Sequence, residues 1–154
     1  MALARIGIGS NLGDAPGNVR RALDELAALG TVVGRSSLYR TEPWGVREQP
    51  DFVNAAALLE TALRPRDLLA ALKALERRLG RVAGSRWGPR VVDLDILTYD
   101  DLELREPGLT IPHERLSERA FALAPLAEID PNFGPLYERL PPEARAAVRR
   151  MEGG

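Results

Sequence analysis

Cysteine is absent from the sequence, and histidine occurs once, as His113. Structural zinc sites are built mainly from cysteine sulfur and histidine nitrogen ligands, so the sequence excludes them. It also excludes nucleophilic sites that are built around several histidines. Any bound metal ion must therefore be held by oxygen atoms. This favours Mg²⁺, a cation that usually takes few protein ligands together with substrate phosphates.

Long hydrophobic runs and an excess of either charge sign are also lacking. No stretch of roughly 18 or more apolar residues occurs, and residues 1–5 lack the pattern of a secretory signal, so we expect a cytoplasmic protein without membrane contacts. The formal net charge of −1 argues against non-specific nucleic-acid binding, which depends on neutralising phosphates. The 154 residues, 45% of them hydrophobic, fit one domain over residues 1–154.

Local patterns predict an alternation of strands and helices through residue 99. Apolar residues recur at helical spacing after Pro16 and Pro65, and Gly30 and Gly80 are the expected stops of these two helices. The expected elements are a strand at 3–9, a helix at 16–30, strands at 31–39 and 52–60, a helix at 65–80 and a strand at 91–99. This order matches the βαββαβ core of ferredoxin-like folds. It predicts an α+β sandwich with helices on one face of a mostly antiparallel sheet.

Further segments connect and extend this core. A long loop at 40–51 and a glycine- and arginine-rich loop at 81–90 separate the core elements, and such loops commonly carry function. A short apolar segment at 109–113 follows the core. Extra C-terminal helices are expected at about 118–128 and 141–150.

Asp93 and Asp95 are the most informative acidic residues. They lie two apart on a predicted strand, so both carboxylates point to the same side, whereas Val92, Leu94 and Ile96 point to the opposite, buried face. Two like charges this close repel one another unless a cation lies between them. This favours a shared metal site, although a solvated polar face with incidental aspartates is an alternative.

A basic and aromatic loop precedes this acidic strand. Arg86, Trp87 and Arg90 follow Arg81 within the loop, and the planar guanidinium of arginine binds phosphate oxygens in a bidentate manner. A polyphosphate held between Mg²⁺ and these arginines is the implied arrangement. Solvated arginines on a surface loop are the alternative, since arginine is abundant throughout the chain.

Two other features are less specific. The segment 7–13 is rich in glycine, but the sequence contains no G-K-[ST] motif, which excludes a P-loop kinase. His113 follows Ile111 and Pro112 and could donate to a phosphate, although a histidine with a purely structural role is the favoured reading at this point.

Taken together, these motifs closely resemble the 6-hydroxymethyl-7,8-dihydropterin pyrophosphokinase family over about residues 5–130. The segments that carry the resemblance are Gly9–Gly13, Ser37–Thr41, Gln49–Ala56, Arg86–Arg90, Asp93–Ile96 and Ile111–His113. The most specific pair is R-W-G-P-R followed by D-L-D-I. The resemblance implies a ferredoxin-like fold and transfer of pyrophosphate from ATP to the pterin in folate biosynthesis, giving AMP and the pterin diphosphate.

The resemblance also implies roles for individual residues. Asp93 and Asp95 are similar to a pair that binds two Mg²⁺ ions, and Arg81, Arg90 and His113 match phosphate-contacting positions. The positions near ATP and its mobile loop are Arg86, Trp87, Ile96 and Arg119. The pterin-contacting positions are Thr41, Pro43, Trp44, Phe52, Asn54 and Phe121. Phe52 and Phe121 would enclose the flat ring by stacking, whereas without the resemblance both would be assigned to the core.

The partners expected from this reading are ATP and 6-hydroxymethyl-7,8-dihydropterin, bound by a monomer that uses neither nucleic acid nor membrane. A non-catalytic ferredoxin-like module that binds a small ligand or RNA is an alternative. The predicted strands lack the paired aromatic residues of an RNA-binding sheet, which argues against RNA. A nucleotide-sugar transferase with a D-x-D motif is a second alternative, for which the chain is short.

Overall fold

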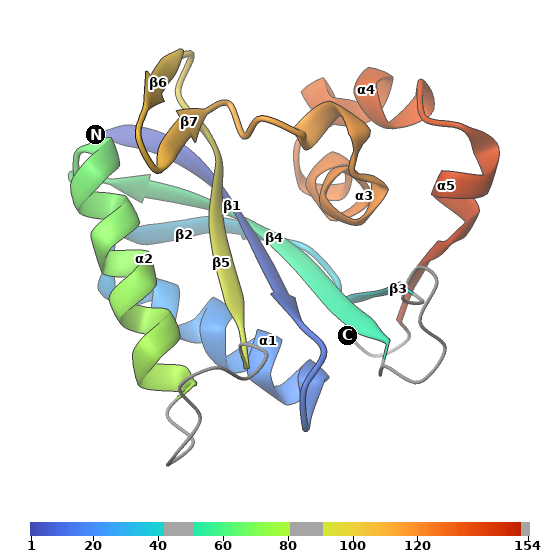
Figure 1. Cartoon of the computed structure of the whole chain (residues 1–154), viewed down its shortest axis with the longest axis horizontal. Helices are drawn as coiled ribbons and strands as arrows, with labels where there is room; N and C mark the ends of the chain where they lie inside the picture. Colours follow the sequence, from blue (N-terminus) through green and yellow to red (C-terminus); the bar gives the residue numbers. More distant parts are fainter. Residues whose placement is uncertain (42–50, 81–90, 152–154) are drawn as a thin grey trace.

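A six-stranded sheet forms the centre of the molecule in the computed structural model, which describes residues 1–41, 51–80 and 91–151. The strand order is β5–β1–β4–β3–β8, and β2 also pairs with β4. Neighbouring strands of this sheet are all antiparallel. Figure 1 shows β1 and β4 side by side in the middle of the sheet, with β5 next to β1. The predicted α+β class is confirmed.

The strands of the sheet and of a separate hairpin are β1 Ala2–Ser10, β2 Thr31–Arg35, β3 Tyr39–Thr41, β4 Phe52–Thr61, β5 Asp93–Tyr99, β6 Leu104–Glu106, β7 Leu109–Ile111 and β8 Val148–Arg150. The α-helices are α1 Ala15–Glu25, α2 Pro65–Leu79, α3 Ala120–Ile129, α4 Gly134–Glu138 and α5 Pro142–Ala146. Short 3₁₀ turns are found at Leu26–Ala28, Leu116–Glu118 and Pro131–Phe133.

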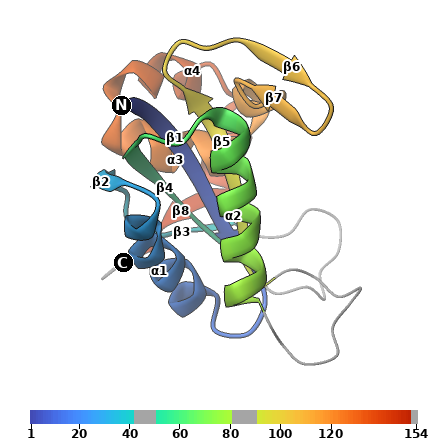
Figure 2. The same ribbon diagram turned by 90° about the vertical axis from the view of Figure 1, so that its left-hand side faces the viewer.

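Helices cover both faces of the sheet because β4 is apolar on both of its faces. Ala55 and Leu59 of β4 pack in one hydrophobic cluster with α1 and α2, whereas Ala56 packs in a second cluster with α3. Side chains alternate along a strand, so these clusters lie on opposite sides of the sheet. The prediction of helices on one face holds for α1 and α2, and α3 adds a partial layer on the other face (Figures 1 and 2).

The two core helices begin and end close to the predicted residues. Asp14 caps α1 by accepting a hydrogen bond from the Gly17 amide at 3.1 Å, and α1 passes into the 3₁₀ turn before Gly30. α2 begins at Pro65, and Gly80 follows its last residue. Among the described residues, none of the helices combines the length and the apolar character that a membrane span requires.

Two sequence predictions were wrong in detail. The helix expected at 141–150 ends at Ala146, and Val148–Arg150 instead forms β8, which pairs with β3 and buries Val148 in the second cluster. The strand expected at 31–39 is divided into β2 and β3, because the backbone N–H of Ser37 donates to the carboxylate of Glu128. In both places tertiary contacts outweigh local propensity.

Candidate active site

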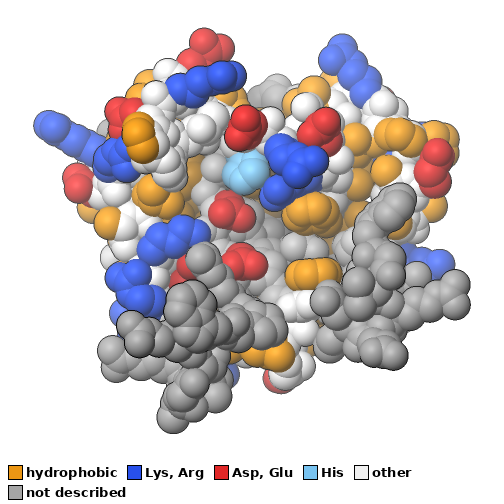
Figure 3. Space-filling view, viewed as in Figure 1, with side chains coloured by type: hydrophobic (Ala, Val, Ile, Leu, Met, Phe, Trp, Pro, Cys, Tyr) orange, Lys and Arg blue, Asp and Glu red, His pale blue; other side chains and the backbone are white. Residues whose placement is uncertain are grey.

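A cavity of about 250 Å³ opens on the sheet face that α3 covers only in part. It lies where β1, β4 and β5 meet the segment that leads into α3. Its lining residues are Gly7, Ile8, Gly9, Thr41, Phe52, Asn54, Ala55, Asp93, Asp95, Leu97, His113, Leu116, Arg119, Phe121 and Ala122. Figure 3 shows the hollow on this face, where the single histidine lies among acidic and basic side chains.

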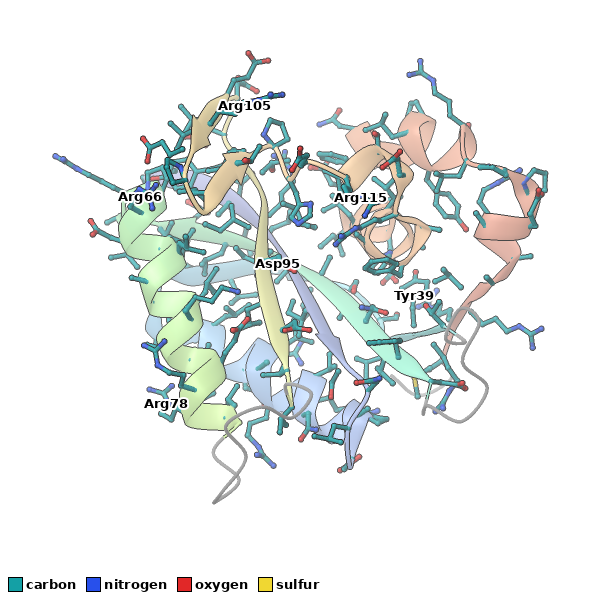
Figure 4. All side chains as sticks on the ribbon, in the orientation of Figure 1. Tyr39, Arg66, Arg78, Asp95, Arg105 and Arg115 are labelled. Atoms are coloured by element: carbon teal, nitrogen blue, oxygen red, sulfur yellow. The ribbon has the colours of Figure 1, made fainter. Side chains whose placement is uncertain are left out.

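Asp93 and Asp95 lie on the same face of β5, as their spacing predicts. Asp93 is exposed and Asp95 is half-buried, while Leu94 and Ile96 between and after them are buried in the opposite cluster. Figure 4 shows Asp95 on β5 near the middle of the sheet. Two carboxylates therefore share one wall of the cavity.

β1 forms the floor of the cavity, and the residues that face the cavity from this strand are glycines. Gly7 lies opposite Asp95 in the strand pairing, and Gly9 lies between Asp93 on one side and Asn54 on the other. A Cβ atom on Gly9 would come within 2.7 Å of the Asn54 Nδ2 atom. Neighbouring strands are about 4.8 Å apart, so the amide and the carboxylate face each other across roughly 10 Å of open floor.

Two polar groups at the far side of the cavity lack partners. The Thr41 Oγ1 and Asn54 Oδ1 atoms are buried and make no hydrogen bond within the described residues. Buried polar atoms in folded proteins nearly always have a partner, so unpaired ones in a cavity mark where a polar ligand fits. The Asn54 side chain offers both an acceptor and donors toward such a ligand.

Aromatic side chains border the same part of the cavity. Phe52 starts β4, and Phe121 lies in the first turn of α3; both are half-buried. The Arg119 guanidinium lies 5.4 Å from the centre of the Phe121 ring, which is a cation–π distance. The structure thus brings together Phe52, Phe121 and the Asn54 amide, whose Oδ1 atom has no hydrogen-bond partner among the described residues.

The surroundings of His113 favour its neutral form. Burial lowers its pKa below the ordinary value of 6.5, and the nearby charge of Arg119 lowers it further. Its Nδ1 atom accepts a hydrogen bond from the Arg115 backbone at 3.3 Å, which assigns the proton to Nε2. The backbone N–H of His113 also donates to the Leu97 carbonyl at 2.8 Å. The imidazole can therefore donate one hydrogen bond from Nε2.

The carboxylate ligands in the cavity suit a cation whose remaining coordination positions are filled by a substrate. Within the parts of the chain that the structure describes, no group of three or more histidine, aspartate or glutamate side chains could hold a metal ion. Among the lining residues that the structure describes, the carboxylate oxygens come from Asp93 and Asp95. A pair of carboxylates with room for phosphates beside it fits Mg²⁺ better than zinc.

Seven predicted site residues are not among the side chains that line the cavity in the described parts of the chain. Pro43, Trp44, Arg81, Arg86, Trp87 and Arg90 fall outside the described residues. The side chain of Ile96 is only 4% exposed and packs in the core beneath the sheet, so it points away from the cavity.

The structure also adds residues that sequence reasoning missed. Gly7 and Gly9 form the floor, and Leu97, Leu116 and Ala122 complete the wall near α3. The alternation of Ile6 and Ile8 with glycines in the first strand was the available signal, because it describes a strand with one bare face. The other three side chains are apolar and carry no chemical signal in the sequence.

Comparisons with known proteins identify relatives over most of the chain. The model of the family 7,8-dihydro-6-hydroxymethylpterin-pyrophosphokinase (HPPK) matches residues 5–131. A 2-amino-4-hydroxy-6-hydroxymethyldihydropteridine pyrophosphokinase of Methylorubrum extorquens is 46% identical over 135 residues, covering 86% of this chain and 85% of that protein. The Pseudomonas aeruginosa protein with the same description is 43% identical, with 96% of each chain covered.

Longer proteins contain a similar region. The mitochondrial folate synthesis bifunctional protein of Pisum sativum is 46% identical over 125 residues, which cover 80% of this chain and 24% of that protein. The crystal structure of Plasmodium falciparum HPPK-DHPS with pteroate matches with a TM-score of 0.71 at 14% identity, covering 90% of this chain and 42% of that chain. This structural match shows the fold alone. The family match and the identities to the full-length bacterial proteins show that the chain belongs to the 7,8-dihydro-6-hydroxymethylpterin-pyrophosphokinase family.

Proposed function

We propose that this chain transfers the pyrophosphoryl group of ATP to the hydroxymethyl group of 6-hydroxymethyl-7,8-dihydropterin, and that the cavity described above is the site of transfer. One observation carries the proposal. The carboxylate pair of Asp93 and Asp95 faces the Asn54 amide, with its unpaired Oδ1 atom, across the glycine floor of β1. Phosphates and a polar heterocycle thus have separate places in one cavity.

The pterin is proposed to lie between Phe52 and Phe121. A flat heteroaromatic ring gains dispersion and electrostatic energy when it stacks on aromatic side chains. The Asn54 amide would form hydrogen bonds with the donor and acceptor atoms at the edge of the ring. The Thr41 hydroxyl would donate or accept a further hydrogen bond beside it. The buried, unpaired atoms of Thr41 and Asn54 support this orientation, because a pterin would satisfy both of them.

The triphosphate is proposed to lie over Asp93 and Asp95. Mg²⁺ held by these carboxylates would neutralise phosphate charge and align the phosphates, and two ions are proposed. His113 would donate from Nε2 to a phosphate oxygen, and Arg119 would add positive charge nearby. Arg81 and Arg90, outside the described residues, are proposed to bind phosphate from the preceding loop.

The chemical step needs no protein nucleophile. The hydroxymethyl oxygen of the pterin attacks the β-phosphorus in line, the bond from that phosphorus to the oxygen bridging it to the α-phosphorus breaks, and AMP leaves. The hydroxyl proton is released to water. Catalysis by the chain then consists of positioning both substrates and stabilising the charge that moves to AMP.

The identity of the nucleotide product tests this function. Protein, ATP, Mg²⁺ and the reduced pterin are mixed, and the products are separated by ion-exchange chromatography. AMP and a pterin diphosphate are expected in equal amounts. Formation of ADP would mean single phosphoryl transfer, and pterin binding without any turnover would favour the non-catalytic module. Light scattering of the same sample tests the proposed monomer.

A further inference from the structure

The backbone between the two aspartates is bonded to helix α2. Leu94 lies between Asp93 and Asp95, and its N–H donates to the Glu76 Oε2 atom at 2.6 Å. The carbonyl of Leu94 accepts from the Lys73 Nζ atom at 3.2 Å. Lys73 Nζ also lies 3.0 Å from Glu76 Oε2. These three groups, Lys73, Glu76 and the Leu94 peptide, are called the α2–β5 clamp below.

The clamp occupies a position where the described residues form no further strand. Within these parts of the chain β5 is an edge strand, and its one neighbour in the sheet order is β1. In an antiparallel ladder, residues alternate between those that bond to the partner strand and those whose N–H and C=O point away from it. Both bonds of Leu94 go to side chains of α2, so its peptide groups point outward. Without the clamp, the N–H and C=O groups of Leu94 would have to hydrogen-bond to water at the edge of the sheet.

The spacing makes the clamp specific to the acidic pair. Asp93 and Asp95 lie opposite Gly9 and Gly7 in the pairing with β1, on either side of the outward-facing Leu94. The sheet therefore fixes β5 from one side at the two aspartates, and α2 fixes it from the other side between them. The directions of the two carboxylates depend on the backbone that this arrangement holds.

The composition of the clamp argues for a role beyond stability. Glu76 is 7% exposed, and Lys73 is the only lysine in the chain. Removing a carboxylate from water is costly, and apolar residues of similar volume often stabilise a protein equally well. The pair of buried Glu76 and half-buried Lys73 instead fixes geometry, because its two members satisfy both the donor and the acceptor of the Leu94 peptide.

We propose that Glu76, supported by Lys73, is a positioning residue that holds Asp93 and Asp95 at the separation needed to share a divalent cation. This inference rests on the proposed function, because it takes the aspartate pair as the cation site. Glu76 acts through the Leu94 peptide. Its loss would let β5 move at the edge that faces α2, where the mutual repulsion of two carboxylates favours their separation.

The experiment measures binding of Mn²⁺, a spectroscopic substitute for Mg²⁺, by electron paramagnetic resonance with a non-hydrolysable ATP analogue. Mutation of a group that supports metal ligands typically weakens metal binding by about 10- to 100-fold. Glu76→Ala is therefore expected to raise the Mn²⁺ dissociation constant at least tenfold. Glu76→Gln retains an oxygen that can accept from Leu94 and should recover most of the affinity. The Leu94 amide proton resonance should move upfield in Glu76→Ala and remain near its wild-type position in Glu76→Gln.

The matched control is Arg78→Met. Arg78 is also on α2 and forms an exposed ion pair with Glu25 at 2.7 Å, away from β5 (Figure 4). This variant should bind Mn²⁺ as wild type does. If Glu76→Ala does not fold, Lys73→Met serves as the second variant and is expected to weaken Mn²⁺ binding less than tenfold but measurably.

Asp95→Asn separates the two ways in which the experiment can fail. If Asp95→Asn loses Mn²⁺ binding while the folded Glu76 and Lys73 variants bind within about twofold of wild type, the positioning role is wrong and the proposed cation site stands. If Asp95→Asn binds Mn²⁺ normally as well, the cation site itself is wrong.

Discussion

The hydroxyl of Tyr39 donates to the carboxylate of Glu128 at 2.6 Å, which ties the short strand β3 to the last turns of α3. Glu128 also accepts from the backbone N–H and the hydroxyl of Ser37, at 3.0 and 3.2 Å. The same helix carries Phe121 into the cavity, and the same strand carries Thr41. One carboxylate therefore fixes two walls of the site relative to each other.

Tyr39→Phe should destabilise the protein by about 1.5–3 kcal/mol, because the buried Tyr39 loses a hydrogen bond to a charged group. Tyr99→Phe is the matched comparison. Its hydroxyl donates at 2.7 Å to the neutral Leu63 carbonyl, so its loss should cost about 0.5–1.5 kcal/mol. Urea denaturation at pH 7 measures both. Equal losses would contradict the assignment of a charged acceptor to Tyr39.

The same pair of variants makes a prediction for alkaline pH. Burial raises the pKa of Tyr39 above its ordinary value of 10.0, and the hydrogen bond to Glu128 raises the pKa further. A group whose pKa is raised in the folded state contributes stability that is complete below pH 10 and is lost as pH rises above it. The wild type should therefore lose stability above pH 10, and Tyr39→Phe should lose less. An unchanged alkaline slope would contradict this account.

Phe52→Ala and Phe121→Ala should each weaken pterin binding by about 1–3 kcal/mol, the range found for stacking of bases on aromatic side chains. ATP affinity should change little. Phe133→Ala is the control, since Phe133 lies under Arg5 at 5.1 Å and outside the cavity. Phe133→Ala should lower the free energy of unfolding without changing the affinity for pterin or for ATP. Calorimetric titration with each ligand checks this, and equal losses for pterin and ATP would indicate a core role instead.

Gly9→Ala should impair pterin binding with little change in stability. The new Cβ would meet the Asn54 Nδ2 atom at 2.7 Å, so the amide must turn away from the ligand. Loss of one or two ligand hydrogen bonds of about 0.5–1.5 kcal/mol each predicts a rise of roughly tenfold in the pterin dissociation constant. Gly34→Ala is the control, because the nearest atoms to its new Cβ belong to the Leu58 side chain, at 3.2 Å and beyond. Normal pterin binding by Gly9→Ala would remove Asn54 from the pterin site.

Asp95→Ala should abolish turnover without unfolding the protein. Removing one of two repelling carboxylates should leave the stability of the ligand-free protein unchanged or slightly higher. Mg²⁺ with a non-hydrolysable ATP analogue should raise the melting temperature of the wild type by mass action, and the variant should lose most of that increase. If the variant retains activity within about tenfold of wild type, its activation barrier has changed by only ~1.4 kcal/mol, and the mechanism is contradicted.

The sequence predicted those features that depend on local periodicity. The opposite orientations of Asp95 and Leu94 follow from the two-residue repeat of a strand, and the bounds of α2 follow from Pro65 and Gly80. The family resemblance also placed Phe121 and Asn54 in one site, and both line the cavity.

Features that depend on the pairing of distant segments could not be predicted. The contact between Gly9 and Asn54 arises from the register of β1 against β4, which no local pattern encodes. β8 is only three residues long, and its pairing with β3 decides its structure. The burial of Glu76 was also missed, since a glutamate within a charged helix is normally exposed.

The strand order has a consequence for how the chain folds as it is made. β1 is the first strand to be synthesised, yet both of its neighbours, β4 and β5, come later in the chain, and its first partner begins at Phe52. Until then Ile6 and Ile8 have no sheet to join. Pairings between distant segments form slowly, and unpaired apolar strands promote aggregation. The nascent chain is therefore most vulnerable before β4 emerges, and the aspartate strand can dock only after that stage has passed.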